Sequence, residues 1–271
     1  MENEVKNGRL SIQTAFQTAQ QQNRAALMPY YTLGYPDRAT SLDVVEAIAP
    51  YSDLLELGVP FSDPLADGPT VQHSTQVALQ NGTTLADCLK MVAELRQRGM
   101  TTPVLLMGYL NPFMAYGLDK LMVDAVAAGV QGFIVPDLPP EEADEMEAAA
   151  AASGLVLVHF LAPTSSPGRI DNVTQRATGF IYLVSLTGVT GARSSLSSDL
   201  AAFVERVRVK ANVPLAIGFG ISTPEQAAAV GHMADGVIVG SALINATNRA
   251  EHDKAAAAAQ FVQSLAEAVA N

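Results

Sequence analysis

Three carboxylates lie close together where an apolar run passes into a loop rich in proline and glycine. Glu56 interrupts the run Leu54–Leu57, and Asp63 and Asp67 follow in the loop. A carboxylate inside a buried strand is costly without a role, and further acids on a rigid loop favour proton transfer to and from a substrate. Two alternatives stay open. Glu56 could pair with a buried base, and Asp63 and Asp67 could serve only as turn residues.

Two glycine-containing segments, Gly218–Ser222 and Gly240–Ala242, each directly follow a short apolar run. Small residues let backbone N–H groups approach an anion, and the positive end of a following helix adds attraction. The segments are therefore candidates for phosphate binding. Ordinary tight turns between a strand and a helix would use the same glycines.

Ser185–Ser194 is a third candidate, because it is small, polar and punctuated by glycine. Such a segment can close over a bound substrate, and Thr190 could then hydrogen-bond a catalytic carboxylate. A surface loop with a solvated Thr190 fits the same composition.

Short apolar runs alternate with helical patterns along the chain, which is typical of a parallel sheet covered by helices. The predicted strands are Leu27–Thr32, Asp53–Leu57, Val104–Gly108, Gly132–Val135, Val156–Phe160, Phe180–Ser185, Pro214–Gly218 and Gly236–Val239. Apolar spacing and end signals predict helices over Arg9–Gln21, Thr84–Gly99, Pro139–Ala152 and Glu251–Ala270, and another opened by a Thr223–Gln226 capping box.

This unbroken series predicts an α/β fold, a single (β/α)8 TIM barrel domain spanning residues 1–271. It would have an extra N-terminal helix and a short phosphate-binding helix after strand eight. A doubly wound open sheet is the main rival, but the turn after the first strand, Gly34–Asp37, lacks its nucleotide-binding glycine pattern. In a barrel the active site forms at the carboxyl ends of the strands, and the loops after strands seven and eight often bind phosphate.

Strand alternation places Glu56 on the face opposite Leu55 and Leu57. If those leucines face the helices, Glu56 points into the mouth of the barrel. Burial there would raise the pKa of its carboxyl group and make it a general acid at neutral pH.

Composition argues against several other classes of protein. The net charge is -11 and no basic cluster appears, so nucleic-acid binding is not expected. The apolar runs are shorter than the roughly 18 residues of a membrane span. The four histidines show no metal-ligand spacing, so no metal site is expected, and the single cysteine, Cys88, fits a reducing, cytoplasmic location.

The segments Leu55–Thr70, Ser185–Arg193, Gly218–Ser222 and Gly240–Ser241 together resemble the tryptophan synthase α subunit family, and the resemblance runs from about Arg9 to the C-terminus. It implies retro-aldol cleavage of indole-3-glycerol phosphate to indole and glyceraldehyde 3-phosphate, without metal or organic cofactor. It gives Glu56 the acid–base role at indole C3 and at the side-chain hydroxyl. Asp67 would assist at the indole N–H, and Thr190 would contact Asp67 when the lid closes.

The resemblance also implies where the substrate binds. Phosphate contacts carry over to Gly191, Gly220, Gly240 and Ser241, with Ala242 at the helix start. The indole pocket would be lined by Tyr30, Leu106, Ile134, Tyr182, Phe219 and Ile238. Two positions depart from the family pattern. Many members have Phe in place of Tyr30, so its hydroxyl needs a partner, and some have Tyr in place of Gly108.

The family's partner is a pyridoxal-phosphate-dependent β subunit, so the resemblance implies an α2β2 complex that passes indole to the partner for L-tryptophan synthesis. The cofactor would belong to the partner only. Pro60, Asp63, Asn111 and Pro112 match the family's contact surface. Three alternatives remain: a stand-alone lyase that releases indole, a catalytically silent barrel that activates a β subunit, and a phosphosugar isomerase.

Overall fold

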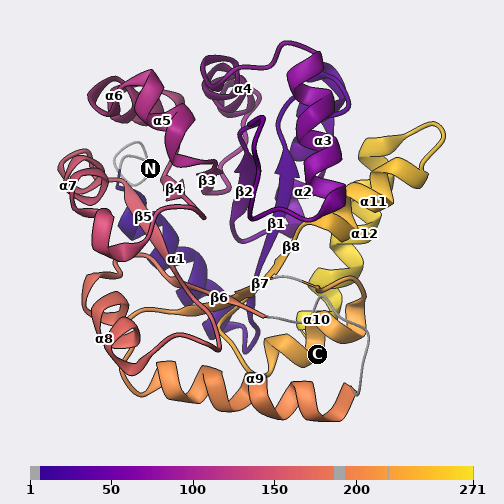
Figure 1. The fold of residues 1–271 in the computed structure, drawn as a ribbon. Helices are drawn as coiled ribbons and strands as arrows, with labels where there is room; N and C mark the ends of the chain where they lie inside the picture. The colour runs from indigo at the N-terminus through magenta and orange to yellow at the C-terminus, as the bar shows by residue number, and fades with distance from the viewer. Residues whose placement is uncertain (1–6, 186–192, 219, 271) are drawn as a thin grey trace.

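The computed structural model describes residues 7–185, 193–218 and 220–270, and it contains a closed barrel of eight parallel strands (Figure 1). The strands follow chain order, and β8 pairs with β1. They are β1 Ala26–Thr32, β2 Leu55–Gly58, β3 Val104–Met107, β4 Gly132–Ile134, β5 Val156–Leu161, β6 Ile181–Val184, β7 Leu215–Gly218 and β8 Gly236–Val239. All eight predicted strands are confirmed, with ends that differ by at most two residues.

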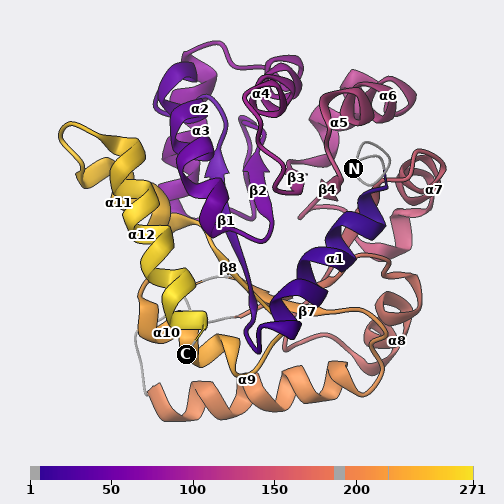
Figure 2. The same ribbon diagram turned by 180° about the vertical axis from the view of Figure 1, so that it is seen from behind.

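Helices surround the barrel on its outside (Figures 1 and 2). They are α2 Arg38–Ile48, α3 Pro69–Gln80, α4 Leu85–Gln97, α5 Leu110–Tyr116, α6 Leu118–Ala128, α7 Asp144–Ala152, α8 Pro167–Arg176, α9 Arg193–Arg208, α10 Pro224–Gly231, α11 Ser241–Arg249 and α12 Lys254–Val269. Short 3₁₀ turns cover Ala49–Tyr51 and Pro140–Glu142. No helix in the described ranges is long and apolar enough to cross a membrane.

The predicted N-terminal helix is present as α1, Gly8–Gln21, which crosses one end of the barrel in Figure 2. Its buried residues Ile12, Phe16 and Ala19 join the core inside the barrel. Phe16 approaches Gly236, the first residue of β8, so α1 closes the end where the strands begin. The opposite end, where the strands finish, is left for a site.

Helix starts follow their sequence signals, with two corrections. The helix predicted over Pro139–Ala152 begins only at Asp144, as α7, because the prolines open a separate 3₁₀ turn. Thr84 opens α4 with a complete capping box, in which Asp87 returns the hydrogen bond. Thr223 accepts from the Gln226 N–H at the start of α10, but the Gln226 side chain instead accepts from the backbone N–H of Ser222. The predicted capping box of α10 is therefore only half formed, and its other half fixes the loop before the helix.

Alternation along β2 directs Glu56 into the barrel, as predicted. Glu56 is in register with Tyr30 of β1 and Leu105 of β3, and register partners of neighbouring parallel strands point to the same side. Leu55 and Leu57 belong to the cluster that packs against the helices. Leu105 belongs to the separate cluster inside the barrel.

The ends where the strands begin are tied together by a repeated arrangement. In each case an arginine from the segment before one strand binds a side-chain oxygen that precedes the next strand. The residue that carries this oxygen also accepts a hydrogen bond from a backbone N–H near the start of the first strand. The three sets are Arg24–Asp53–Leu27, Arg96–Gln131–Val104 and Arg208–Asp235–Leu215. Each set joins two neighbouring strands at the end of the barrel where the strands begin.

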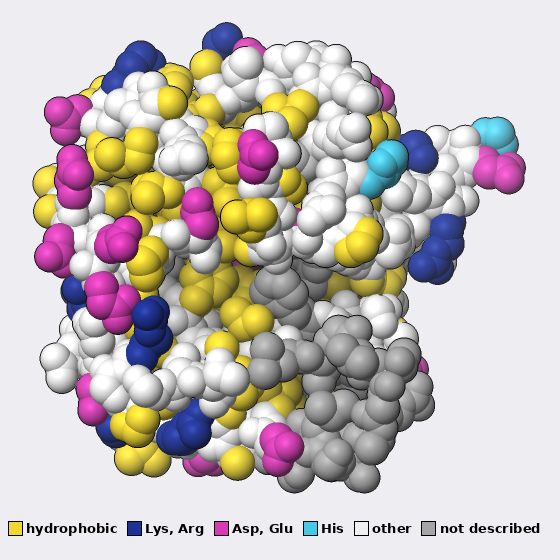
Figure 3. All heavy atoms as spheres, viewed as in Figure 1, with side chains coloured by type: hydrophobic (Ala, Val, Ile, Leu, Met, Phe, Trp, Pro, Cys, Tyr) yellow, Lys and Arg dark blue, Asp and Glu magenta, His cyan; other side chains and the backbone are white. Residues whose placement is uncertain are grey.

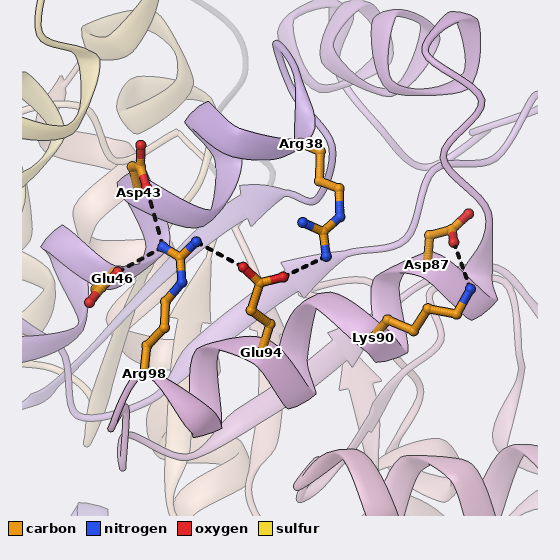
Figure 4. A network of polar contacts seen from close by, with 7 residues as sticks. All are labelled: Arg38, Asp43, Glu46, Asp87, Lys90, Glu94 and Arg98. Carbon is orange, nitrogen blue, oxygen red and sulfur yellow. Dashed lines mark hydrogen bonds and ion pairs between the residues drawn. The ribbon is translucent and has the colours of Figure 1, made fainter.

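A second polar network lies on the outer surface between α2 and α4 (Figure 4). Glu94 bonds to Arg38 at 2.6 Å and to Arg98 at 2.8 Å, and Arg98 also reaches Asp43 and Glu46. These side chains are between 30 % and 60 % exposed, so solvent screens their attraction and each pair contributes little to stability.

The two networks should therefore differ in their effect on stability. Asp53→Ala removes two bonds from the largely buried Arg24 and one from Leu27 N–H, at 2.6, 2.8 and 2.8 Å. We expect it to lower the unfolding free energy by about 3 kcal/mol, because it leaves a buried charge unpaired. Glu94→Ala should lower it by less than about 1 kcal/mol. Urea unfolding of both variants measures this, and equal losses would contradict it.

Candidate active site

A cavity of about 410 Å³ opens at the end of the barrel where the strands finish. Its walls come from strand ends and from the loops that follow β2, β7 and β8. The residues that line it include Tyr30, Glu56, Asp67, Val71, Met107, Tyr182, Gly220, Ser222, Ile238, Gly240, Ser241, Ala242, Asn245 and Arg249. The cavity thus unites the carboxylate segment and both glycine segments of the sequence.

Glu56 is fully buried at the wall of this cavity. Within the described residues neither of its carboxyl oxygens has a hydrogen-bond partner. Burial raises the pKa of Glu56 well above its ordinary value, because nothing nearby offsets the loss of water around the charged form. Burial therefore favours the protonated form of Glu56 over the carboxylate. The alternative that it pairs with a buried base is wrong for the part of the chain described here.

Asp67 lies on the loop between β2 and α3 and has a different environment. The Tyr109 hydroxyl donates to its Oδ2 at 3.0 Å and accepts from the Ala66 N–H at 3.0 Å. Burial raises the pKa of Asp67 to about 6, while the Tyr109 hydrogen bond lowers it. The cavity therefore holds one carboxyl group whose burial favours the protonated form and a second that is ionised above a pH of about 6, which suits paired acid and base chemistry.

Tyr109 was not predicted as a site residue. It is buried just after β3, where its ring packs against Phe61 with centroids 5.3 Å apart. A tyrosine directly after a strand end is the only sequence signal that could have drawn attention to it. Its pairing with the β2–α3 loop depends on tertiary structure.

Two tyrosines predicted for the pocket, Tyr30 and Tyr182, do line the cavity. Each hydroxyl occupies space that a side chain on the next strand would otherwise fill. A Cβ atom on Gly58 would lie 2.1 Å from the Tyr30 hydroxyl, and one on Gly218 would lie 2.1 Å from the Tyr182 hydroxyl. Glycine is therefore required at both positions for the rings to lie as they do.

The predicted phosphate-binding residues Gly220, Gly240 and Ser241 line the same cavity, together with Ala242 at the start of α11. Gly240 is the N-cap of α11 and gives no side-chain cap, so the first turn of the helix faces the cavity uncapped. These glycine-containing loops form one end of the cavity, so they do more than connect a strand to a helix by a tight turn.

Asn245 and Arg249 also line this end of the cavity, although the sequence analysis did not select them. They follow Ser241 at intervals of four residues on α11, so the three share one face of that helix. Arg249 brings a positive charge to a chain of net charge -11 and would attract a phosphate group. The spacing on α11 was visible in the sequence, but which face meets the cavity was not.

Several predicted pocket residues are placed differently. Leu106 belongs to the cluster against the helices, because its register partner is Leu57, so the prediction that it lines the pocket is wrong. Met107 lines the cavity from β3 instead. Ile238 lines the cavity as predicted, whereas Ile134 packs in the barrel interior without lining it. Three predicted residues lie outside the described ranges: Thr190, Gly191 and Phe219.

The predicted partner-contact residues differ in exposure. Asp63 and Asn111 are exposed and Pro112 is half-buried. Pro60 is buried, which argues against a direct contact with a partner. Leu65 is 92 % exposed on the same loop as Asp63, so this loop presents an apolar side chain that the sequence analysis did not select.

A second hollow, of about 860 Å³, lies at the opposite end of the barrel beside α1. Its arginines are already neutralised, because Arg24 pairs with Asp53 and Arg208 with Asp235. Among the described residues no group of three or more His, Cys, Asp or Glu is placed to hold a metal ion. The first cavity, with its unpaired Glu56, is therefore the better candidate for an active site.

Comparison with known proteins agrees with this fold and site. The family model for the tryptophan synthase alpha chain matches residues 16–270. The tryptophan synthase alpha chain of Chloroflexus aurantiacus is 52% identical over 249 residues, covering 91% of this chain and 94% of that protein. The one from Chloroflexus aggregans is 49% identical over 259 residues, covering 95% and 97%.

Solved structures match closely as well. The tryptophan synthase α subunit from Legionella pneumophila superposes with a TM-score of 0.88 at 37% identity, covering 96% of this chain and 98% of that one. A chain of ligand-free tryptophan synthase from M. tuberculosis gives a TM-score of 0.87 at 34% identity, covering 96% and 99%.

Fold and site together define a (β/α)8 barrel protein whose cavity joins two carboxyl groups to a glycine-lined end. Within that class, the chain belongs to the tryptophan synthase alpha chain family, the lyases of tryptophan biosynthesis that cleave indole-3-glycerol phosphate.

The Tyr109 contact predicts a change in pH dependence. If Asp67 acts through its negative charge, activity should fall as the pH drops through its pKa of about 6, because the protonated group is neutral. Tyr109→Phe removes a hydrogen bond that lowers this pKa, so the acidic limb of kcat/KM should move up by about one pH unit. Tyr116→Phe is the matched control, because its hydroxyl bonds to Asp124 outside the cavity. Identical profiles for the two variants would disprove the role of Tyr109.

Proposed function

We propose that the cavity of this chain cleaves indole-3-glycerol phosphate into indole and glyceraldehyde 3-phosphate. The observation that carries the proposal is the buried Glu56 carboxyl group, which lacks a partner among the described residues and shares a cavity with Asp67 and the glycine-lined end. Family membership supports the same reaction.

The reaction moves one proton from a hydroxyl group on the glycerol phosphate chain of the substrate to indole C3. Glu56, protonated through burial, donates to C3, and the ring becomes an indolenine cation. The resulting Glu56 carboxylate is a strong base in its buried site and accepts the hydroxyl proton. The carbon–carbon bond then breaks, its electrons return to the ring, and indole and an aldehyde are formed. Glu56 ends the cycle protonated, as it began.

Asp67 stabilises the step that creates positive charge. As a carboxylate at neutral pH it accepts a hydrogen bond from the indole N–H, which becomes more acidic when C3 is protonated. Tyr109 holds Asp67 on one side. Apolar walls from Met107 and Ile238 suit the indole ring, and the Gly240–Ala242 end suits the phosphate.

The family implies a β subunit as partner, and we propose the complex is α2β2 with indole passed directly to the partner. Hydrophobic side chains gather on the surface beside α4, α5 and α6 (Figure 3). The exposed Leu65 and Met114 belong to the loop after β2 and to α5. We therefore place the contact surface there, with Asp63 and Asn111. The pyridoxal phosphate would belong to the partner, this chain would need no cofactor, and the complex would be cytoplasmic.

Substitution of either carboxylate should separate chemistry from binding. Glu56→Gln and Asp67→Asn keep the shape of the cavity, so indole-3-propanol phosphate should bind within about threefold of wild type. Cleavage should fall at least about 100-fold, as expected for loss of a general acid. Calorimetry and an indole-release assay measure the two quantities. Unchanged cleavage in Glu56→Gln would refute the proposed acid.

Dependence on the partner distinguishes a subunit from a stand-alone lyase. We expect indole release to rise at least about tenfold when a β subunit is added, and the two proteins to co-elute on sizing. Asp63→Ala should weaken that stimulation while leaving the basal rate unchanged, because Asp63 is exposed and does not line the cavity. Full basal activity with neither stimulation nor a complex would instead identify a stand-alone enzyme.

A further inference from the structure

Tyr30 lies between the two functional ends of the cavity. It is the register partner of Glu56 on the neighbouring strand. Its Cβ and Cδ1 atoms lie 3.4 Å from the place where a side chain on Gly240 would begin. In a ligand that reaches from Glu56 to the glycine-lined end, the middle part therefore lies beside the Tyr30 ring.

The Tyr30 hydroxyl begins a chain of buried hydrogen bonds. Its Oη lies 3.2 Å from Thr32 Oγ1, which lies 2.7 Å from Ser74 Oγ, and Ser74 Oγ lies 2.9 Å from the backbone oxygen of Val71. Tyr30, Thr32 and Ser74 are all buried. The chain thus connects β1, at the cavity wall, to α3 behind it.

The last link sets the direction of the whole chain. A carbonyl oxygen only accepts, so Ser74 gives its single hydroxyl proton to Val71. Ser74 must then accept from Thr32, and Thr32 must accept from Tyr30. The proton of Tyr30 is therefore given to Thr32, so toward any further group the Tyr30 oxygen can only accept. Burial also raises the pKa of Tyr30, so the hydroxyl stays protonated.

Two other partners for this acceptor are less suitable. Glu56 has no hydrogen-bond partner within the described residues, so its proton is not given to Tyr30. An indole N–H is better matched by the charged Asp67 than by a neutral phenol oxygen. The middle of the substrate, by contrast, carries hydroxyl groups, which are donors.

We propose that Tyr30 is a specificity-determining residue whose oxygen accepts a hydrogen bond from a hydroxyl of the three-carbon chain between indole and phosphate. The inference rests on the proposed function. The family usually has Phe at this position. The added hydroxyl of Tyr30 would make the cavity bind a ligand with a polyol phosphate chain more tightly than one whose chain lacks hydroxyl groups. Gly58 is part of the device, since any larger residue would displace the hydroxyl.

The test compares two ligands that differ in the chain hydroxyls. Indole-3-glycerol phosphate carries them, and indole-3-propanol phosphate has none. Affinities are measured by calorimetry in the Glu56→Gln background, where cleavage is too slow to disturb binding. Tyr30→Phe should weaken binding of the glycerol ligand about fivefold, the worth of one neutral hydrogen bond, and leave the propanol ligand unchanged.

Tyr31→Phe is the matched control. Tyr31 is the next residue, equally buried, and its hydroxyl bonds to Thr247 on α11 rather than facing the cavity. It should change neither affinity. Equal binding of the glycerol ligand with and without the Tyr30 hydroxyl would overturn the inference and leave the proposed function standing. Failure of the propanol ligand to bind the unsubstituted chain would overturn the proposed function, and this inference with it.

Discussion

Burial of the Glu56 carboxyl group without a partner among the described residues is the constraint on which the site depends. A charged carboxylate is costly in this position, so burial raises the pKa of Glu56 and favours its protonated form, which can act as an acid. The barrel makes this possible. The alternation of β2 turns Glu56 inward, and the leucines on either side anchor the strand to the helices. The cost of its anion is what suits it to the proposed role of a general acid.

A second carboxylate remains useful because its environment is different. Asp67 is on a loop, is less deeply buried and accepts from Tyr109, so its pKa stays near 6. Tyr109 belongs to the segment after β3 that also carries Asn111. One hydrogen bond thus connects the catalytic loop to the surface proposed for the partner. Movement of that surface could change the position and the pKa of Asp67, which offers a physical route for activation.

Stability and catalysis are divided between the two ends of the barrel. Where the strands begin, charged groups are paired and bonded to backbone N–H groups, as in Arg24–Asp53 and Arg208–Asp235. Where they end, Glu56 has been left without a partner in the described part of the chain. Unpaired polar groups destabilise a fold. The paired and hydrogen-bonded groups at the end where the strands begin therefore help the barrel to tolerate unpaired groups at the other end.

Local sequence patterns were enough to predict the barrel, its eight strands, the N-terminal helix and the inward direction of Glu56. Strand alternation, apolar runs and helix-end residues are short-range signals, and each survived in the fold. Leu106 shows where this reasoning fails. Motif similarity suggested that it lines the pocket, but its register with Leu57 turns it toward the helices. Register between strands is a long-range property that no single segment contains.

The sequence by itself therefore determined which residues could do chemistry and which end of the barrel would hold them. Only the tertiary structure decided their chemical states. The different pKa values of Glu56 and Asp67 arise from burial and from a tyrosine 42 positions away in the chain. The direction of the Tyr30 hydroxyl is likewise set by a carbonyl on another element. Solvation and hydrogen-bond polarity depend on neighbours in space, and those are settled only when the chain has folded.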